Sequence, residues 1–397
     1  MIYLDNASTT VIEKEVLDSY QALLLAYYAN PASSHKLGVQ TASLQTKARE
    51  MILSLLKLKD YEVIFTSGAT EANNLLLRGV AFAYQNRGKH IITSKVEHPS
   101  ILNTCKQLEE LYGFKVTYLD VNEEGVVDLE KLQSAIQKDT ILVSLMHVNN
   151  ETGAINPLKE IKEILKGYPH IYFHSDAVQG FSKVPFDYNN VDAFTLSAHK
   201  IHGLKGSGAL IKRKSIRLVS QLTGGNQEDG YRSGTSNFPV NVALAKTIRL
   251  ALEKQNKNYE HVKVLHNYLF AELSKMDNIV INSTKNGSPY IFNLSLKDKK
   301  GPVIAQALNN EDIYVSTVSA CSNKSEPMSK VIYAMFNDES RAKSSLRISF
   351  SKDTTLDEVV KFKDTLLKIL CSVKWGIYVK IWFYFNKIWR IKYKRKK

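Results

Sequence analysis

The sequence feature that most constrains the fold is a regular alternation of short apolar segments and helix-length segments between residues 62 and 212. Short apolar strands joined by crossover helices predict a mainly parallel sheet that is covered on both faces. We therefore expect an α/β fold built on seven strands. These strands are Glu62–Thr66, His90–Ser94, Lys115–Leu119, Thr140–Met146, Ile171–Ser175, Asp192–Ser197 and Gly208–Lys212.

Helical periodicity fills the intervals between these strands and also precedes them. Before the sheet, two helices are expected, and Asn30 and Pro31 separate them because the residue before a proline avoids the α region. The expected helices are Ile12–Tyr27, Gly38–Leu56, Glu71–Gln85, Ser100–Tyr112, Leu129–Ile136, Leu158–Leu165 and, near the end of the chain, Leu356–Leu370.

Polar and ionisable side chains follow five of the predicted strands at the point where each strand ends. In open α/β sheets, ligands bind beside the carboxyl ends of the strands. One such residue is usually a helix cap or a satisfied polar group, but five strand ends with such residues are hard to explain in that way. The residues concerned are Ser67–Thr70, His98, Asn150, Asp176, and the pair His199 and Lys200.

The segment Ser67–Thr70 opens a predicted helix with small residues. Backbone N–H groups at such a helix start can bind an anion, and the Thr70 hydroxyl would support this binding. An ordinary N-cap is the alternative, since Ser and Thr are favoured at that position for any helix. Taken alone, the segment favours the ordinary cap.

Lys200 stands between a predicted strand and a glycine-rich turn. A lysine becomes a nucleophile when desolvation and neighbours lower its pKa, and it then forms Schiff bases with aldehydes. An ordinary surface lysine is the alternative in a basic protein. Together with the anion cradle, the Asp176 carboxylate and the His98 ring, however, Lys200 matches the needs of pyridoxal 5′-phosphate (PLP). Asn150 or Gln179 could hydrogen-bond the phenolic oxygen of the PLP ring.

An ordered set of motifs resembles the cysteine desulfurases, a branch of the class V aminotransferases of fold-type I. The motifs are YLDNASTT (3–10), NPASSH (30–35), TSGATEANN (66–74), EHPS (97–100), HVNNETG (147–153), HSDAVQG (174–180), SAHKIHGLKGSG (197–208), RSGTSN (232–237), SAC (319–321) and SSLRISF (344–350). They cover about residues 1–365. The resemblance implies a large PLP-binding domain at 12–255, a smaller α+β domain made of 1–11 and 256–370, and an extension at 371–397.

The resemblance also implies roles for individual residues. Lys200 would hold PLP covalently, Asp176 would pair with its pyridine nitrogen, and His98 would stack on the ring and help to move protons. Arg347 and Asn150 would bind the substrate carboxylate. The other implied PLP contacts are Ala69, Thr70, Gln179, Ser197 and His199, with Thr235 supplied by the other subunit of a homodimer; no metal is implied.

Cys321 would accept the sulfur atom. It lies in the polar segment Ser316–Pro327, where a cysteine is more exposed and more reactive than in a core. The implied reaction converts L-cysteine to L-alanine and leaves a persulfide on Cys321. Departures from the family pattern are Val318, where glycine is common, and Leu204, where proline is common; neither is a catalytic group.

The spacing from Cys321 to Arg347 resembles a long-loop subgroup, which passes persulfide directly to partner proteins. An Fe–S scaffold or a tRNA 4-thiouridine sulfurtransferase is the expected acceptor, so the sulfur would serve tRNA thiolation or cofactor synthesis. Three alternatives remain open: a selenocysteine lyase, a class V aminotransferase, and a catalytically silent scaffold for sulfur transfer.

The cysteine content and the charge distribution indicate the compartment in which the protein works. Cys105, Cys321 and Cys371 make an odd number without a CxxC pair, which argues against a disulfide framework or a zinc knuckle and suits the cytoplasm. The N-terminus lacks the pattern of a signal peptide. Nine of the fourteen net positive charges lie within residues 371–397, so the rest of the chain is nearly balanced.

The C-terminal extension carries all three tryptophans, Trp375, Trp382 and Trp389, at intervals of seven residues. On a helix they would form one stripe with Tyr378 and Phe385. Lysines interrupt the segment, so a transmembrane span is not expected. A basic aromatic helix could lie on an anionic membrane or contact tRNA. An extra packing helix, or an extension without a role, is the alternative.

Overall fold

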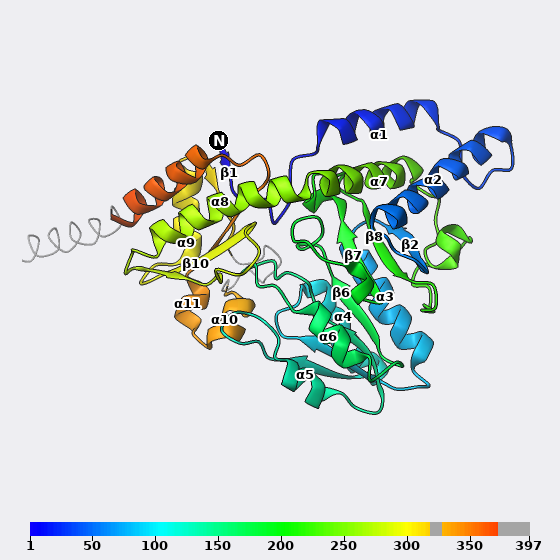
Figure 1. The fold of residues 1–397 in the computed structure, drawn as a ribbon, viewed down its shortest axis with the longest axis horizontal. Helices are drawn as coiled ribbons and strands as arrows, with labels where there is room; N and C mark the ends of the chain where they lie inside the picture. Colours follow the sequence, from blue (N-terminus) through cyan, green and yellow to red (C-terminus); the bar gives the residue numbers. More distant parts are fainter. Residues whose placement is uncertain (318–327, 372–397) are drawn as a thin grey trace, which may run out of the picture.

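The computed structural model describes residues 1–317 and 328–371. Its centre is a seven-stranded sheet with the order β2-β8-β7-β6-β5-β3-β4. A smaller group of strands and helices lies beside this sheet (Figure 1). The strands of the large sheet are β2 (Tyr61–Thr66), β3 (His90–Ser94), β4 (Lys115–Leu119), β5 (Thr140–Ser144), β6 (Tyr172–Asp176), β7 (Ala193–Ser197) and β8 (Gly208–Arg213).

The direction of the strands confirms the prediction of a mainly parallel α/β sheet. β4, β3, β5, β6 and β7 pair in parallel, whereas β8 runs antiparallel to both β7 and β2. The last residues of β2 and β7, Thr66 and Ser197, both pair with Gly208 at the start of β8. Six strand ends and the beginning of β8 therefore meet at one edge of the sheet.

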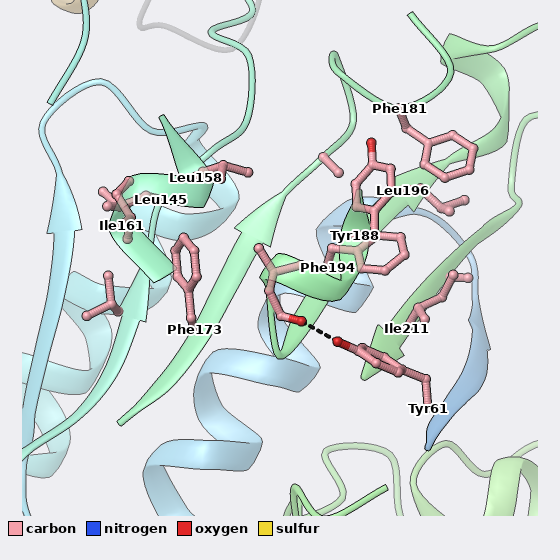
Figure 2. Packing of buried hydrophobic residues seen from close by; sticks show 14 of the residues in the cluster. Tyr61, Leu145, Leu158, Ile161, Phe173, Phe181, Tyr188, Phe194, Leu196 and Ile211 are labelled. Atoms are coloured by element: carbon pink, nitrogen blue, oxygen red, sulfur yellow. Dashed lines mark hydrogen bonds between the residues drawn. The ribbon is translucent and has the colours of Figure 1, made fainter. Parts of the chain in front are cut away.

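Helices cover both faces of the sheet, and the strands alternate their side chains between the two layers. In β8, Ala209 and Ile211 join one buried cluster while Leu210 joins the other. Figure 2 shows the first cluster, in which Tyr61 donates a hydrogen bond from its hydroxyl to the Val191 carbonyl at 2.5 Å. The helices around the sheet are α1 (Lys14–Ala26), α2 (Lys36–Leu55), α3 (Ala69–Tyr84), α4 (Pro99–Tyr112), α5 (Leu129–Ala135), α6 (Leu158–Leu165) and α7 (Phe238–Glu253).

A further buried cluster lies around a small antiparallel sheet, in which β10 pairs with β9 and β12. The N-terminal strand β1 pairs in parallel with β11, so the start of the chain joins this cluster. The division into 12–255 and 1–11 with 256–370 stays a prediction. The elements are β1 (Ile2–Tyr3), α8 (Gln255–Leu273), β9 (Ile279–Ile281), β10 (Ile291–Leu296), α9 (Gly301–Asn309), β11 (Ile313–Tyr314), α10 (Lys330–Phe336), α11 (Glu339–Lys343), β12 (Ser345–Ser349) and a helical segment at 356–371.

Four helices, α1 to α4, begin one or two residues away from the expected positions. α2 begins at Lys36 rather than Gly38, since the His35 side chain accepts a hydrogen bond from the Gly38 N–H and so caps the helix. α3 begins at Ala69 rather than Glu71, directly after Gly68. Within residues 1–317 and 328–371, no helix is both long enough and apolar enough to span a bilayer.

Candidate active site

A cavity of about 600 Å³ opens where the carboxyl ends of the strands meet. Backbone and side chains of the N-terminal turn, Ala7–Thr9, close one side of it. The cavity brings together ten of the residues that the sequence singled out. They are Ala69, Thr70, His98, Asn150, Asp176, Gln179, Ser197, His199, Lys200 and Arg347.

One predicted site residue, Thr235, is not among the described residues that line the cavity. Thr235 is exposed in the loop before α7, and its predicted contact with the PLP of a second subunit stays a prediction. Cys321 lies outside the described residues, as does the tail from 372 to 397.

The start of α3 has the features of an anion cradle. Among the described residues, no side chain caps this helix at Gly68. Ser67 instead gives both its N–H and its hydroxyl to the Glu71 carboxylate, at 2.9 and 2.6 Å. The first N–H groups of α3 are thus left without a side-chain partner, which suits a phosphate. The ordinary Ser/Thr cap that the sequence favoured is therefore not formed.

Glycines at 68 and 208 allow this segment to lie close to β8. A Cβ atom on Gly208 would come within 2.6 Å of the Gly68 Cα atom. Real Cβ atoms do not approach a backbone so closely, so a larger residue at position 208 would push the helix start away from the sheet. Gly208 thus positions the cradle beside Ser197 at the end of β7.

Lys200 points its amine at the N-terminal turn. Its Nζ atom donates hydrogen bonds to the carbonyl oxygens of Ala7 and Ser8, at 2.5 and 2.7 Å. The turn is held in place by Thr10, whose N–H donates to the His199 carbonyl at 2.9 Å. Backbone carbonyls at two adjacent residues therefore orient the predicted Schiff-base lysine.

Asp176, the last residue of β6, is buried and accepts two hydrogen bonds. The Asn73 amide donates to its Oδ2 atom at 2.8 Å, and the Val178 N–H donates to its Oδ1 atom at 3.1 Å. Two donors hold the carboxylate in a defined orientation within the cavity wall. That arrangement suits a partner for a protonated ring nitrogen.

Two histidines border the cavity, and burial lowers the pKa of both. His98 caps α4, and its pKa is lowered by burial and by nearby Lys200, against the influence of Asp176. The pKa of His199 falls to about 4 because of burial and neighbouring lysines. Its Nδ1 atom lies 3.2 Å from the Thr9 hydroxyl. A neutral ring can stack on a cofactor or hydrogen-bond a phosphate.

Arg347 reaches the cavity from β12 of the small sheet. Its Nη1 atom donates to the Asn150 carbonyl at 2.9 Å, and its Nη2 atom donates to Asp5 Oδ1 at 2.9 Å and to Ser8 Oγ at 2.6 Å. A guanidinium held in this way is suited to a carboxylate ligand. The distant part of the chain that carries Arg347 therefore meets Lys200 at one site.

Comparison with known proteins identifies the family. The sequence pattern of the family described as "Aminotransferase class-V" matches residues 2–362. The chain belongs to this family. It is 40% identical to "Cysteine desulfurase IscS" of Dictyoglomus turgidum, covering 93% of this chain and 94% of that protein.

Solved structures agree with this family assignment. The fold is similar to that of a "NIFS-LIKE PROTEIN", with a TM-score of 0.87 and 34% identity, covering 93% of this chain and 99% of the other. It is also similar to "SspA in complex with cysteine", with a TM-score of 0.78 and 31% identity, covering 89% of this chain and 100% of the other.

The class-V family uses PLP, and the donors around the cavity fit that cofactor. The uncapped start of α3 suits the phosphate, the Lys200 amine suits the aldehyde, and the Asp176 carboxylate suits the ring nitrogen. The volume of about 600 Å³ is within the usual range for small-molecule sites. The chemistry of these groups therefore agrees with PLP without any further ligand.

Sequence reasoning missed several residues that support the site. Asn73 holds Asp176, and Lys183 donates from Nζ to Gln179 Oε1 at 3.0 Å. Gln179 in turn donates from Nε2 to the Ala7 carbonyl at 2.9 Å. Lys183 stands only four residues after Gln179, and this short spacing could have indicated their contact from the sequence. The Ala7 carbonyl has no side-chain signature, so only the structure could reveal its part.

Proposed function

We propose that the protein is a PLP-dependent cysteine desulfurase that converts L-cysteine to L-alanine and keeps the sulfur as a persulfide on Cys321. The observation that carries this proposal is the meeting of Lys200, Asp176 and Arg347 in one cavity. An amine, a buried carboxylate and a guanidinium together suit PLP and an amino-acid carboxylate. The names of relatives such as the IscS of Dictyoglomus turgidum give the substrate class.

The residues that would hold PLP surround the cavity. Lys200 would bind it covalently, Asp176 would face the ring nitrogen, and His98 would lie against the ring. When bound, PLP supplies an electron sink that lets bonds at the substrate Cα and Cβ atoms break. The remaining contacts would come from Ala69, Thr70, Asn150, Gln179, Ser197 and His199, and from Thr235 of the partner subunit in a homodimer.

Arg347 would bind the carboxylate of L-cysteine, with Asn150 beside it. Asp5 and Ser8 already hold the Nη2 atom, so the guanidinium is oriented before substrate arrives. A group that is already ordered loses little side-chain entropy on binding. Lys200, held by the carbonyls of Ala7 and Ser8, is then the amine placed to move the Cα proton.

Cys321 would take the sulfur. Its thiolate attacks the substrate sulfur, a new S–S bond forms, and the Cβ–S bond breaks. The electron pair stays with the Cβ carbon, which takes up a proton to become the methyl group of alanine. The persulfide on Cys321 then passes to an acceptor protein in the cytoplasm. An Fe–S scaffold or a tRNA 4-thiouridine sulfurtransferase are the two acceptor classes to test.

The experiment that tests this function measures alanine and sulfide formed from L-cysteine in the presence of a thiol reductant. We expect wild-type protein to release both. Cys321→Ser should keep the absorbance of bound PLP but lose sulfide release. Cys371→Ser is the matched control, because Cys371 is exposed and is not among the described residues that line the cavity.

Two outcomes would overturn the proposal. Normal sulfide release by Cys321→Ser would remove Cys321 from the reaction. Turnover of selenocysteine without cysteine, or transfer of the amino group to a keto acid, would assign the protein to one of the other activities of this fold. Mixing purified protein with each candidate acceptor then identifies where the persulfide goes.

A further inference from the structure

Asn73 lies on α3, is fully buried and uses its whole amide group in hydrogen bonds. Its Nδ2 atom donates to Asp176 Oδ2 at 2.8 Å and to Ser100 Oγ at 2.9 Å. Its Oδ1 atom accepts from the Thr195 hydroxyl at 2.6 Å. A carboxylate only accepts hydrogen bonds, so Asp176 fixes which end of the Asn73 amide faces it.

Ser100 connects this amide to His98. Its hydroxyl oxygen accepts from Asn73, so its own hydrogen is free to point at His98 Nδ1, which lies 2.8 Å from Oγ. The backbone N–H of Ser100 also points at Nδ1, at 3.2 Å. A backbone N–H cannot accept a hydrogen bond, so a proton on Nδ1 would face another donor. Together, the two donors of Ser100 therefore favour a lone pair on Nδ1.

The surroundings of the ring also oppose a charged imidazole. His98 stands at the N-terminus of α4, where the helix dipole disfavours a cation. Burial, together with the nearby Lys200, lowers the pKa of His98, although Asp176 acts in the other direction. A neutral ring with a lone pair on Nδ1 has its proton on Nε2.

We propose that Asn73 is a positioning residue that links Asp176 to His98 and, through the Ser100 hydroxyl, holds His98 in the tautomer protonated at Nε2. Since Nδ1 is the nitrogen that bonds to the described part of the protein, Nε2 is left to face a molecule in the cavity. The consequence for catalysis rests on the proposed function: His98 enters the reaction as a proton donor, and Lys200 is the first base.

The tautomer can be measured directly by NMR of the full chain with ¹⁵N-labelled histidine, with and without PLP. His98→Gln identifies the His98 signals by their disappearance. We expect Nδ1 in the chemical-shift range of an unprotonated nitrogen and Nε2 in that of a protonated nitrogen at neutral pH. A proton on Nδ1, or on both nitrogens, overturns the proposal.

Variants separate the role of Asn73 from a general effect on folding. Asn73→Leu keeps a similar volume but removes both donors, so the Ser100 hydroxyl can accept a hydrogen bond from Nδ1. We expect the Nδ1-protonated tautomer to become populated in this variant. In Asn73→Leu with Ser100→Ala, that acceptor is gone and the backbone N–H remains, so the Nε2-protonated tautomer should return.

The matched control is Asn74→Leu. Asn74 is the next residue on α3, and its side chain bonds to the Thr70 carbonyl and the Thr104 hydroxyl instead. This variant should leave the His98 signals unchanged. If Asn73→Leu also leaves them unchanged, Asn73 does not position His98. If Asn73→Leu does not fold, Asn73→Ala, which removes the same donors, takes its place, and unchanged His98 signals in that variant overturn the proposal.

This test is independent of turnover. The NMR signals report the tautomer whether or not the protein releases sulfide from L-cysteine. A protein without desulfurase activity but with the expected signals would overturn the proposed function and leave the assignment of Asn73 intact. A protein that releases sulfide but lacks the expected NMR signals would show that Asn73 does not position His98, and it would leave the proposed function intact.

Discussion

The amine of Lys183 is buried and donates a hydrogen bond to Gln179 Oε1 at 3.0 Å. The Gln179 amide therefore has its oxygen towards Lys183 and its nitrogen towards the Ala7 carbonyl. Lys200 donates to the same carbonyl. A buried lysine behind the cavity thus orients the group that faces it.

Lys183→Met should change how stability depends on pH. Burial, with Lys200 and Arg347, lowers the pKa of Lys183 from 10.5 to about 7. Below pH 7 Lys183 is protonated in both the folded and the unfolded state. The buried charge then destabilises the folded state in full. Between pH 7 and 10.5 the unfolded state binds more protons, so the wild type should gain stability as pH rises. Relative to Lys183→Met the gain is roughly 3–5 kcal/mol, at about 1.4 kcal/mol per pKa unit.

Urea unfolding at pH 7 and pH 10 measures this difference. Lys214→Met is the control, because Lys214 is exposed and its removal should leave the pH dependence of the wild type unchanged. A parallel pH dependence of wild type and Lys183→Met would show that Lys183 does not titrate in this range.

Glu97, the neighbour of His98, should have the opposite effect: its titration should lower the free energy of unfolding as pH rises. Burial raises its pKa from 4.5 to about 8, and nearby Asp176 adds to this. Its Oε2 atom is buried without a hydrogen-bond partner among the described residues, whereas Oε1 accepts from Ser94 and from the Met146 N–H. The neutral acid is therefore the form that suits this position.

Glu97→Gln mimics the neutral acid and should remove its pH dependence. Below pH 4.5 the carboxyl group is protonated in both states, and stability is unaffected. As pH rises from 4.5 to 8, the unfolded state releases its proton first, so the wild type loses stability relative to Glu97→Gln. Unfolding curves should show that the stability of Glu97→Gln relative to the wild type is greater at pH 9 than at pH 5. The same difference in stability at both pH values would contradict the assignment.

The secondary structure and most of the candidate site could be predicted because both have local signals. Apolar strands alternate with helices, and residues such as Asp176 and Lys200 directly follow strands. The pairing of β1 with β11 had no such signal, since their residues Ile2 and Ile313 are far apart in the sequence. Yet this pairing helps to anchor the N-terminal turn whose carbonyls hold Lys200.

Supporting residues were missed for a different reason. Asn73 is one of two adjacent asparagines in a helix, and sequence alone does not say which one is buried. In the structure Asn73 faces β6 and β7, where it meets Asp176 and Thr195, while Asn74 is only half-buried. Tertiary packing, rather than local propensity, distinguishes the two.

Gly180→Ala should strongly destabilise the protein. A Cβ atom at position 180 would lie 2.1 Å from Nδ1 of His147, whose ring is buried. The tightly packed ring has little room to move, so we expect a loss of roughly 3 kcal/mol or more in the free energy of unfolding. Gly167→Ala is the matched control, since its nearest neighbour would be the Ile164 carbonyl oxygen at an ordinary 3.6 Å.

Thermal unfolding of both glycine variants tests this prediction. Gly167→Ala should unfold close to the wild-type temperature, and Gly180→Ala should unfold well below it. Equal unfolding temperatures for Gly180→Ala and the wild type would mean that the His147 ring has another position available.

Arg347→Lys should weaken substrate binding while leaving PLP bound. The guanidinium makes three hydrogen bonds at once, to Asn150, Asp5 and Ser8, and a lysine ammonium cannot reproduce this planar fork. If Arg347 binds the carboxylate of L-cysteine, loss of a charge-assisted hydrogen bond of about 1.5–3 kcal/mol should raise KM roughly 10- to 100-fold. Arg249→Lys, on the exposed side of α7, is the control and should keep the wild-type KM. Steady-state alanine formation measures both, and an unchanged KM in Arg347→Lys with PLP still bound would assign the carboxylate to another residue.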